Sequence, residues 1–221
     1  MDIFGGAWTN YVDEMTQNLN DILTDEDILL IAGDISWAMQ IENAQPDLDF
    51  IASFKGKKVI LRGNHDYWWK AISVVRKMAG ENTFVIQNDS IKIGNVVIAG
   101  SRGWVEGGDE ENQKIYAREV LRIKMSLDDA QKKRQEGDKL IIMTHYPPFD
   151  ARKVTKEQIE NGTFTHPVVD AITKANADAV VYGHIHGQHY KGEIKTVVNN
   201  IPYYLSSCDI LQNKPVLVLE V

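Results

Sequence analysis

Apolar residues fall at helical spacing and in short runs along the first third of the chain. They recur every three or four positions over 8–22, 42–54 and 68–78, which predicts three amphipathic helices. Two short apolar runs, 27–31 and 58–61, lie between these helices and predict buried strands. Because strands that alternate with helices are typical of βα units, this part of the chain predicts a parallel sheet.

The pattern then changes to shorter segments. Residues 83–86, 90–93 and 96–99 are β-rich and separated by Asn-Asp and Gly-Asn turns, which predicts hairpins or a meander. Residues 149–166 predict a loop with one short helix, long enough to serve as a lid. Without repeats or linkers, we expect one domain over 1–221. The remaining predicted elements are helices at 116–130 and 168–175 and strands at 139–144, 178–182, 193–198, 202–206 and 216–221.

Composition narrows the class of protein. Hydrophobic residues make up 43% of the 221 positions, which is enough for a sizeable core. The net charge of −7 argues against nucleic acid as the main partner, because phosphate backbones bind basic surfaces. The single cysteine allows no intrachain disulfide, and no apolar run reaches the roughly 18 residues of a membrane span. We therefore expect a cytoplasmic protein with no membrane partner; the composition leaves its oligomeric state open.

Four predicted strands end in polar residues that can bind metals. The stretches that follow them are Gly33-Asp34, Gly63-Asn64-His65-Asp66, Thr144-His145 and Gly183-His184-Ile185-His186. Each stretch alone is a weak signal, since a polar turn or a core histidine explains it equally well. Ligands gather at the carboxyl ends of strands in α/β sheets. We therefore expect the following side chains to converge on one point: Asp34, Asn64, His145, His184 and His186.

These oxygen and nitrogen donors include no thiolate. Such a mixed set suits Mn, Fe, Zn, Co or Ni better than it suits a structural zinc site lined by cysteine. A carboxylate can also bridge two cations, and paired cations clamp both oxygens of a phosphoryl displacement. We therefore expect two divalent metal ions as cofactors.

In this order and at these distances, the motifs resemble those of the calcineurin-like metallophosphoesterase family. The family pattern is Asp-x-His, Gly-Asp, Gly-Asn-His-Asp/Glu, a lone His and Gly-His-x-His, and residues 33 to about 206 follow it. The resemblance implies a four-layer α/β/β/α sandwich. It also implies hydrolysis of phosphate mono- or diesters, with a small phosphorylated substrate attacked by a metal-bound hydroxide.

The resemblance assigns a role to each matching residue. Asp34 would bridge two metal ions, and His186 would bind the first of them. The remaining ligands of the second ion would be Asn64, His145 and His184.

By the same resemblance, the residues that follow Asn64 would act on the leaving group. His65 would be the general acid at the leaving oxygen. Asp66 would orient the His65 ring.

One family motif has no counterpart in this chain. No histidine precedes Asp34, and no apolar strand carrying Asp-x-His opens the sequence. We therefore expect the first strand to be missing through N-terminal truncation, and strand 27–32 to be an unpaired edge or to pair with 216–219. The first metal would keep only Asp34 and His186, so hydrolysis would be poor unless another residue, such as Asp2 or His189, completes the site.

Arginines and aromatic residues stand close to these motifs. Arg62 and Arg102 are candidates for a phosphate clamp, because a guanidinium fork matches phosphate oxygens; ordinary surface salt bridges would explain them as well. Trp37, Trp68 and Tyr146 are candidates for the wall of a substrate cleft. Their alternative role is to seal the seam between sheet and helices.

Two other functions remain open on the same fold. One is a non-catalytic interaction module, and the other is a protein that binds a single metal ion. His65 favours an enzyme over the first, because a scaffold does not need a general acid beside metal ligands. The missing Asp-x-His motif favours the second.

Overall fold

The computed structural model describes residues 5–150, 154–161, 164–187 and 190–221. Within these ranges the strands form two sheets. The first sheet is parallel, with the order β1-β2-β3. The second has the order β4-β5-β6-β7-β9-β8, with β5, β6, β7 and β9 parallel and each edge strand antiparallel to its neighbour. The strands are β1 (Ile28–Ile31), β2 (Lys57–Ile60), β3 (Thr83–Val85), β4 (Asp89–Ile93), β5 (Val96–Ser101), β6 (Lys139–Thr144), β7 (Ala179–Tyr182), β8 (Lys195–Val198) and β9 (Ile201–Leu205).

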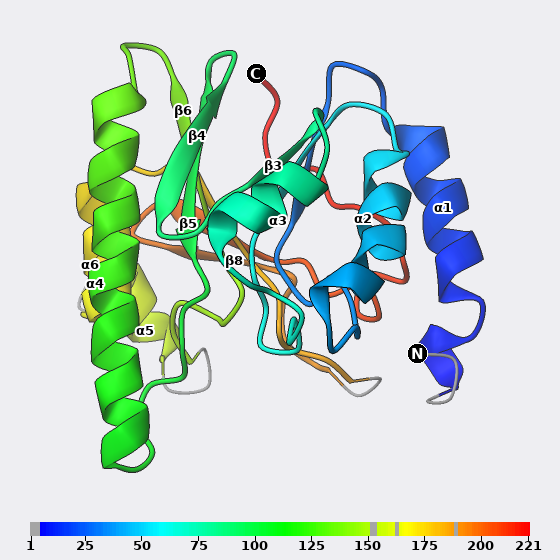
Figure 1. Cartoon of the computed structure of the whole chain (residues 1–221). Helices are drawn as coiled ribbons and strands as arrows, with labels where there is room; N and C mark the ends of the chain where they lie inside the picture. The colour runs from blue at the N-terminus through cyan, green and yellow to red at the C-terminus, as the bar shows by residue number, and fades with distance from the viewer. Residues whose placement is uncertain (1–4, 151–153, 162–163, 188–189) are drawn as a thin grey trace.

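Helices cover the outer face of each sheet (Figure 1). On the side of the first sheet lie η2 (Gly6–Trp8), α1 (Tyr11–Ile22), η3 (Ile41–Ala44), α2 (Gln45–Ala52) and α3 (Ile72–Met78). On the side of the second sheet lie α4 (Glu110–Lys133), α5 (Lys156–Glu160) and α6 (Pro167–Lys174). None of the helices in these ranges is both long enough and apolar enough to cross a lipid bilayer.

Apolar clusters hold the layers together, and three of them are the largest. One packs α4 and α6 against the second sheet, around residues such as Ile123, Leu140 and Ile172. Another lies between the two sheets and includes Val59 and Ile98. A third packs α2 and α3 against the first sheet. The order helices, sheet, sheet, helices confirms the four-layer sandwich that the family resemblance implies.

Three local predictions are wrong. Residues 83–86 were expected to join a hairpin, but β3 pairs in parallel with β2 in the other sheet. The helix expected over 68–78 begins only at Ile72. Residues 216–221 form no strand; Val218 and Leu219 instead pack as side chains against the cluster between the sheets.

β1 lies at the edge of the first sheet. In the described part of the chain its only ladder is the parallel one with β2, whose register pairs Leu30 with Val59. This is the unpaired edge expected from the missing family motif. Asp34 follows the end of β1 and lies beside the residues that follow β2 and β6.

Candidate metal and catalytic site

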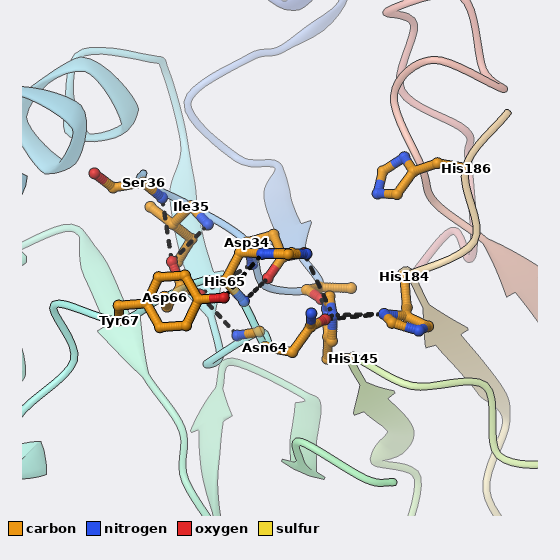
Figure 2. Close-up of polar contacts among 12 residues, drawn as sticks. Asp34, Ile35, Ser36, Asn64, His65, Asp66, Tyr67, His145, His184 and His186 are labelled. Atoms are coloured by element: carbon orange, nitrogen blue, oxygen red, sulfur yellow. Dashed lines mark hydrogen bonds and ion pairs between the residues drawn. The ribbon is translucent and has the colours of Figure 1, made fainter. Parts of the chain in front are cut away.

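Four strand ends bring four candidate ligands together (Figure 2). Asp34 follows β1, Asn64 follows β2, His145 follows β6 and His184 follows β7. His145 Nε2 lies 2.6 Å from Asn64 Oδ1, 3.2 Å from His184 Nδ1 and 3.5 Å from Asp34 Oδ2. His184 Nδ1 lies 2.9 Å from Asn64 Oδ1. We call these four side chains the donor cluster.

Two glycines allow the loops after β1 and β2 to approach so closely. A Cβ atom on Gly63 would overlap both the Oδ1 atom and the backbone nitrogen of Asp34. A Cβ atom on Gly33 would lie 2.7 Å from the Gly63 nitrogen and 2.8 Å from His145 Nδ1. Since real Cβ atoms do not approach other atoms this closely, the Gly-Asp and Gly-Asn motifs need glycine for packing.

Two residues of the donor cluster have left-handed backbone conformations. The φ angle is 56° at Asp34 and 69° at His184. For residues with a Cβ atom this conformation is uncommon and costs free energy, and it is concentrated at functional sites. Both residues stand where a strand turns into the loop that carries the next motif residues, and the side chains of both belong to the donor cluster.

The two histidines of the cluster are held neutral. His145 Nδ1 lies 2.8 Å from the carbonyl oxygen of Ala32, which can only accept a hydrogen bond, so the lone pair of the neutral ring is on Nε2. Burial lowers the pKa of His145 to about 4. Burial, and then the neighbouring His145, lower the pKa of His184 to about 4. Neutral imidazole is the form that binds metals.

The donor cluster fits a divalent cation. His145 Nε2 and Asn64 Oδ1 both carry lone pairs, and at 2.6 Å they repel each other unless a cation lies beside them. Two ligand atoms of one ion, each about 2.1 Å from it, lie roughly 3.0–3.4 Å apart, close to the separations found here. In the ranges described, no group of three or more His, Cys, Asp or Glu side chains could hold a metal ion, so such a site depends on the amide oxygen of Asn64.

His186 does not join the donor cluster as expected. Its Nδ1 atom lies 2.8 Å from Asp209 Oδ1, and the ring lies 5.7 Å from the ring of Trp8. Figure 2 shows His186 apart from the other four side chains, on the segment that follows His184. The expected convergence of His186 with Asp34 is therefore not found, and Asp209 is the side chain that contacts His186.

Asp209 is the partner of His186, and sequence reasoning did not predict this contact. It accepts hydrogen bonds from His186 and from the backbone N–H of Gly187 (2.9 Å). Burial raises its pKa, but these hydrogen bonds outweigh burial and leave the pKa below its ordinary value. Its position in the chain could have indicated this contact. Asp209 follows β9, which pairs in parallel with β7, so it lies near the same end of the sheet as His184 and His186. Asp2 and His189, the residues suggested for this part of the site, lie outside the described residues.

His65 lies beside the donor cluster. Its backbone N–H donates to Asp34 Oδ1 (2.8 Å). Its ring stacks on Trp37, with centroids 5.6 Å apart and planes 5° apart. Its Nδ1 atom lies 3.5 Å from the Tyr67 hydroxyl oxygen.

Asp66 has a different role from the one expected. It is fully buried and accepts five hydrogen bonds, none of them from the His65 ring. Burial raises its pKa, although these hydrogen bonds favour the ionised form. Asp66 thus fastens the loop after β1 to the loop after β2 instead of orienting His65. The donors are the backbone N–H groups of Asp34, Ile35, Ser36 and Gly63 and the indole N–H of Trp68.

The residues expected to contact substrate differ in exposure. Trp68 is completely buried and donates to Asp66, so its expected substrate contact is wrong. Tyr146 is buried against His184, with ring centroids 4.1 Å apart, and burial raises its pKa. Burial, and then the positive charge of Arg102, lower the pKa of Arg62. Among the described residues, the buried Nε atom of Arg62 has no hydrogen-bond partner.

Comparison with known proteins identifies the family. The donor cluster lies at the carboxyl ends of parallel strands, where α/β sheets commonly bind ligands, and its oxygen and nitrogen atoms suit a divalent cation. The model of the calcineurin-like phosphoesterase family matches residues 6–188, so the chain belongs to this family of metal-dependent phosphoesterases. No curated protein matches the sequence.

Solved structures with a similar fold are distant in sequence. TT1561 of Thermus thermophilus is 11% identical with a TM-score of 0.56, over 91% of this chain and 84% of that protein. AQ665 of Aquifex aeolicus, a protein of unknown function, is 17% identical with a TM-score of 0.46, over 95% and 82%. At 11% identity, the likeness to TT1561 extends to the fold alone.

Proposed function

We propose that this chain hydrolyses small phosphate mono- or diesters in a metal-dependent reaction. The observation that carries the proposal is the donor cluster, in which four strand ends place one carboxylate, one amide oxygen and two neutral imidazoles around one point. When bound, divalent cations would activate water and neutralise charge on the phosphoryl group. Asp34, Asn64, His145 and His184 would hold the second ion, and Asp34 and His186 the first.

His65 supplies the proton in this proposal. Its backbone hydrogen bond to Asp34 fixes its place beside the donor cluster, and its ring is partly exposed. A histidine can donate a proton near neutral pH, which the alkoxide of a poor leaving group requires. His65 would therefore act at the leaving oxygen.

Arg62 and Arg102 hold the phosphate oxygens. The two side chains are near enough for the charge of Arg102 to lower the pKa of Arg62, so a shared anion would stabilise both. The buried Arg62 Nε, which lacks a hydrogen-bond partner among the described residues, is a donor for such an anion.

The test combines leaving groups with variants. With Mn²⁺ supplied, the chain should hydrolyse nitrophenyl mono- and diesters and, more slowly, alkyl esters. His65→Ala should lower the alkyl ester rate by about 10²–10⁴ and the nitrophenyl rate much less, with metal content unchanged. Asp34→Asn should lose metal and both activities. Equal losses on both ester types for His65→Ala would refute the acid role, and no hydrolysis by the wild type would refute the function.

A single-metal binding protein is the second candidate. It is supported by the separation of His186 from the donor cluster and by its pairing with Asp209. Metal analysis separates the two: one tightly bound ion without ester hydrolysis supports this alternative. Two bound ions with hydrolysis support the phosphoesterase.

A further inference from the structure

Two large aromatic side chains beside His65 remain exposed. Trp37, on the loop after β1, is 58% exposed, and Tyr67, on the loop after β2, is 53% exposed. The neighbouring Trp68 and Trp69 are 0% and 5% exposed, so this part of the chain does bury tryptophan where the core needs it. Exposed apolar surface that gathers at one place marks binding sites more often than isolated exposed residues do. Packing of the core therefore does not explain why Trp37 and Tyr67 are aromatic.

Both rings contact the ring of His65. Trp37 stacks nearly parallel to it, with centroids 5.6 Å and planes 5° apart. Tyr67 meets it edge-on, with centroids 6.0 Å and planes 84° apart. Trp37 and Tyr67 thus border the imidazole from two directions, and Figure 2 shows Tyr67 beside His65.

The position of the proton donor fixes the position of the leaving group. In the proposed function, on which this inference rests, His65 gives a proton to the leaving oxygen. A general acid must be within hydrogen-bond reach of the atom it protonates, so the group attached to that oxygen lies beside the His65 ring. The side chains that border His65 are therefore the ones that the leaving group meets.

We propose that Trp37 and Tyr67 bind the leaving group, and that this group is a planar aromatic ring system such as an aryl-substituted alcohol or a nucleoside. The indole ring of Trp37 and the phenol ring of Tyr67 lie near the partly exposed imidazole of His65, and they can make stacked and edge-to-face contacts with the leaving group. Those contacts favour a flat ring over an aliphatic group of equal hydrophobicity.

A pair of uncleavable probes tests the site without requiring turnover. 3-Phenylpropylphosphonate and 3-cyclohexylpropylphosphonate carry a methylene group in place of the bridging oxygen, and they differ only in the ring, which is flat and aromatic in one and saturated and slightly more hydrophobic in the other. With Mn²⁺ supplied, calorimetry should show the phenyl compound binding about 3- to 10-fold more tightly. Trp37→Leu should reduce this ratio to about 1, whereas Trp37→Phe should retain it. Leu121→Ala, at an exposed position on α4, serves as the remote control.

The possible outcomes are distinct. Equal binding of both phosphonates by the wild type, or an unchanged ratio in Trp37→Leu, would overturn the aromatic site. Because Trp37 is largely exposed, Trp37→Leu should fold normally, and circular dichroism checks this.

The matching esters, 2-phenylethyl and 2-cyclohexylethyl phosphate and their methyl diesters, form a separate arm. If none is hydrolysed while the preference for 3-phenylpropylphosphonate holds, the proposed function fails and the aromatic site stands. If both cyclohexyl and phenyl esters are hydrolysed equally well, the function stands and the aromatic preference is refuted.

Discussion

Replacing Asp66 by asparagine tests whether this carboxylate organises the site or serves His65. The asparagine side chain would have the same shape but only one oxygen. In the wild type, Ile35, Ser36 and Trp68 donate to one carboxylate oxygen, and the N–H groups of Asp34 and Gly63 donate to the other, at 3.0 and 2.7 Å. If the asparagine oxygen takes the place of the first of these, the asparagine NH₂ group faces the N–H groups of Asp34 and Gly63. The opposite orientation leaves three donors without an acceptor.

The free energy of unfolding should therefore fall substantially. A buried donor that loses its acceptor costs about 1–3 kcal/mol, so two of them cost about 2–6 kcal/mol. This is a large share of the roughly 5–15 kcal/mol by which domains are stable. Since the two donors are the backbone groups that place Asp34 and Asn64, Mn²⁺ affinity should fall as well.

Urea denaturation and Mn²⁺ titration of Asp66→Asn measure both effects. Asp49→Asn is a matched control, because Asp49 is exposed and accepts one side-chain hydrogen bond, from Gln45 (2.8 Å); its loss should stay below about 0.5 kcal/mol. Unchanged stability and metal affinity, with slower cleavage of alkyl esters alone, would refute the structural role and restore Asp66 as the partner of His65.

Two further measurements test the histidines. In metal-free protein, His145 has a pKa of about 4 in the folded state and about 6.5 in the unfolded state. Between these pH values the unfolded state binds more protons than the folded state. The free energy of unfolding should therefore fall by about 3 kcal/mol as the pH drops from 6.5 to 4. Urea midpoints of the wild type and His145→Asn check this, and the same acid sensitivity in both would contradict it. Asp209→Asn should weaken Mn²⁺ binding at the position served by His186 about 10-fold, because the acceptor that fixes His186 is altered. Spectroscopic Mn²⁺ titration that shows identical affinities for both proteins would exclude such a role.

The strand ends were predictable because their signal is local. A short apolar run followed by Gly-Asp, Gly-Asn-His-Asp or Gly-His-x-His is visible within ten residues, and parallel strands bring such ends to one edge. The strand at 139–144 has the predicted bounds, and Asp34, Asn64, His145 and His184 meet as expected. Family resemblance supplied the four layers, which periodicity alone does not specify.

The errors concern contacts between distant positions. Asp66 binds donors 30–32 residues away, and His186 binds Asp209, 23 residues away. The apolar spacing at 68–78 fits a helix, but Trp68 donates to Asp66 and Trp69 to Gln87, which holds both outside α3. The sequence correctly predicts a turn near Asn88, whose φ angle is 62°. This turn does not close a hairpin; it connects β3 to the other sheet.

The hydrogen bonds of Asp66 also explain how a strained backbone persists at Asp34. A left-handed residue with a Cβ atom costs about 1–3 kcal/mol and needs surroundings that hold it in place. Asp66 accepts the N–H groups of Asp34 and of the next two residues, Ile35 and Ser36, so the turn is fixed from one carboxylate. Asp34 in turn accepts the N–H of His65. Each loop therefore supplies the acceptor that the other loop needs, and Asp34 and His65 are positioned by one reciprocal set of hydrogen bonds.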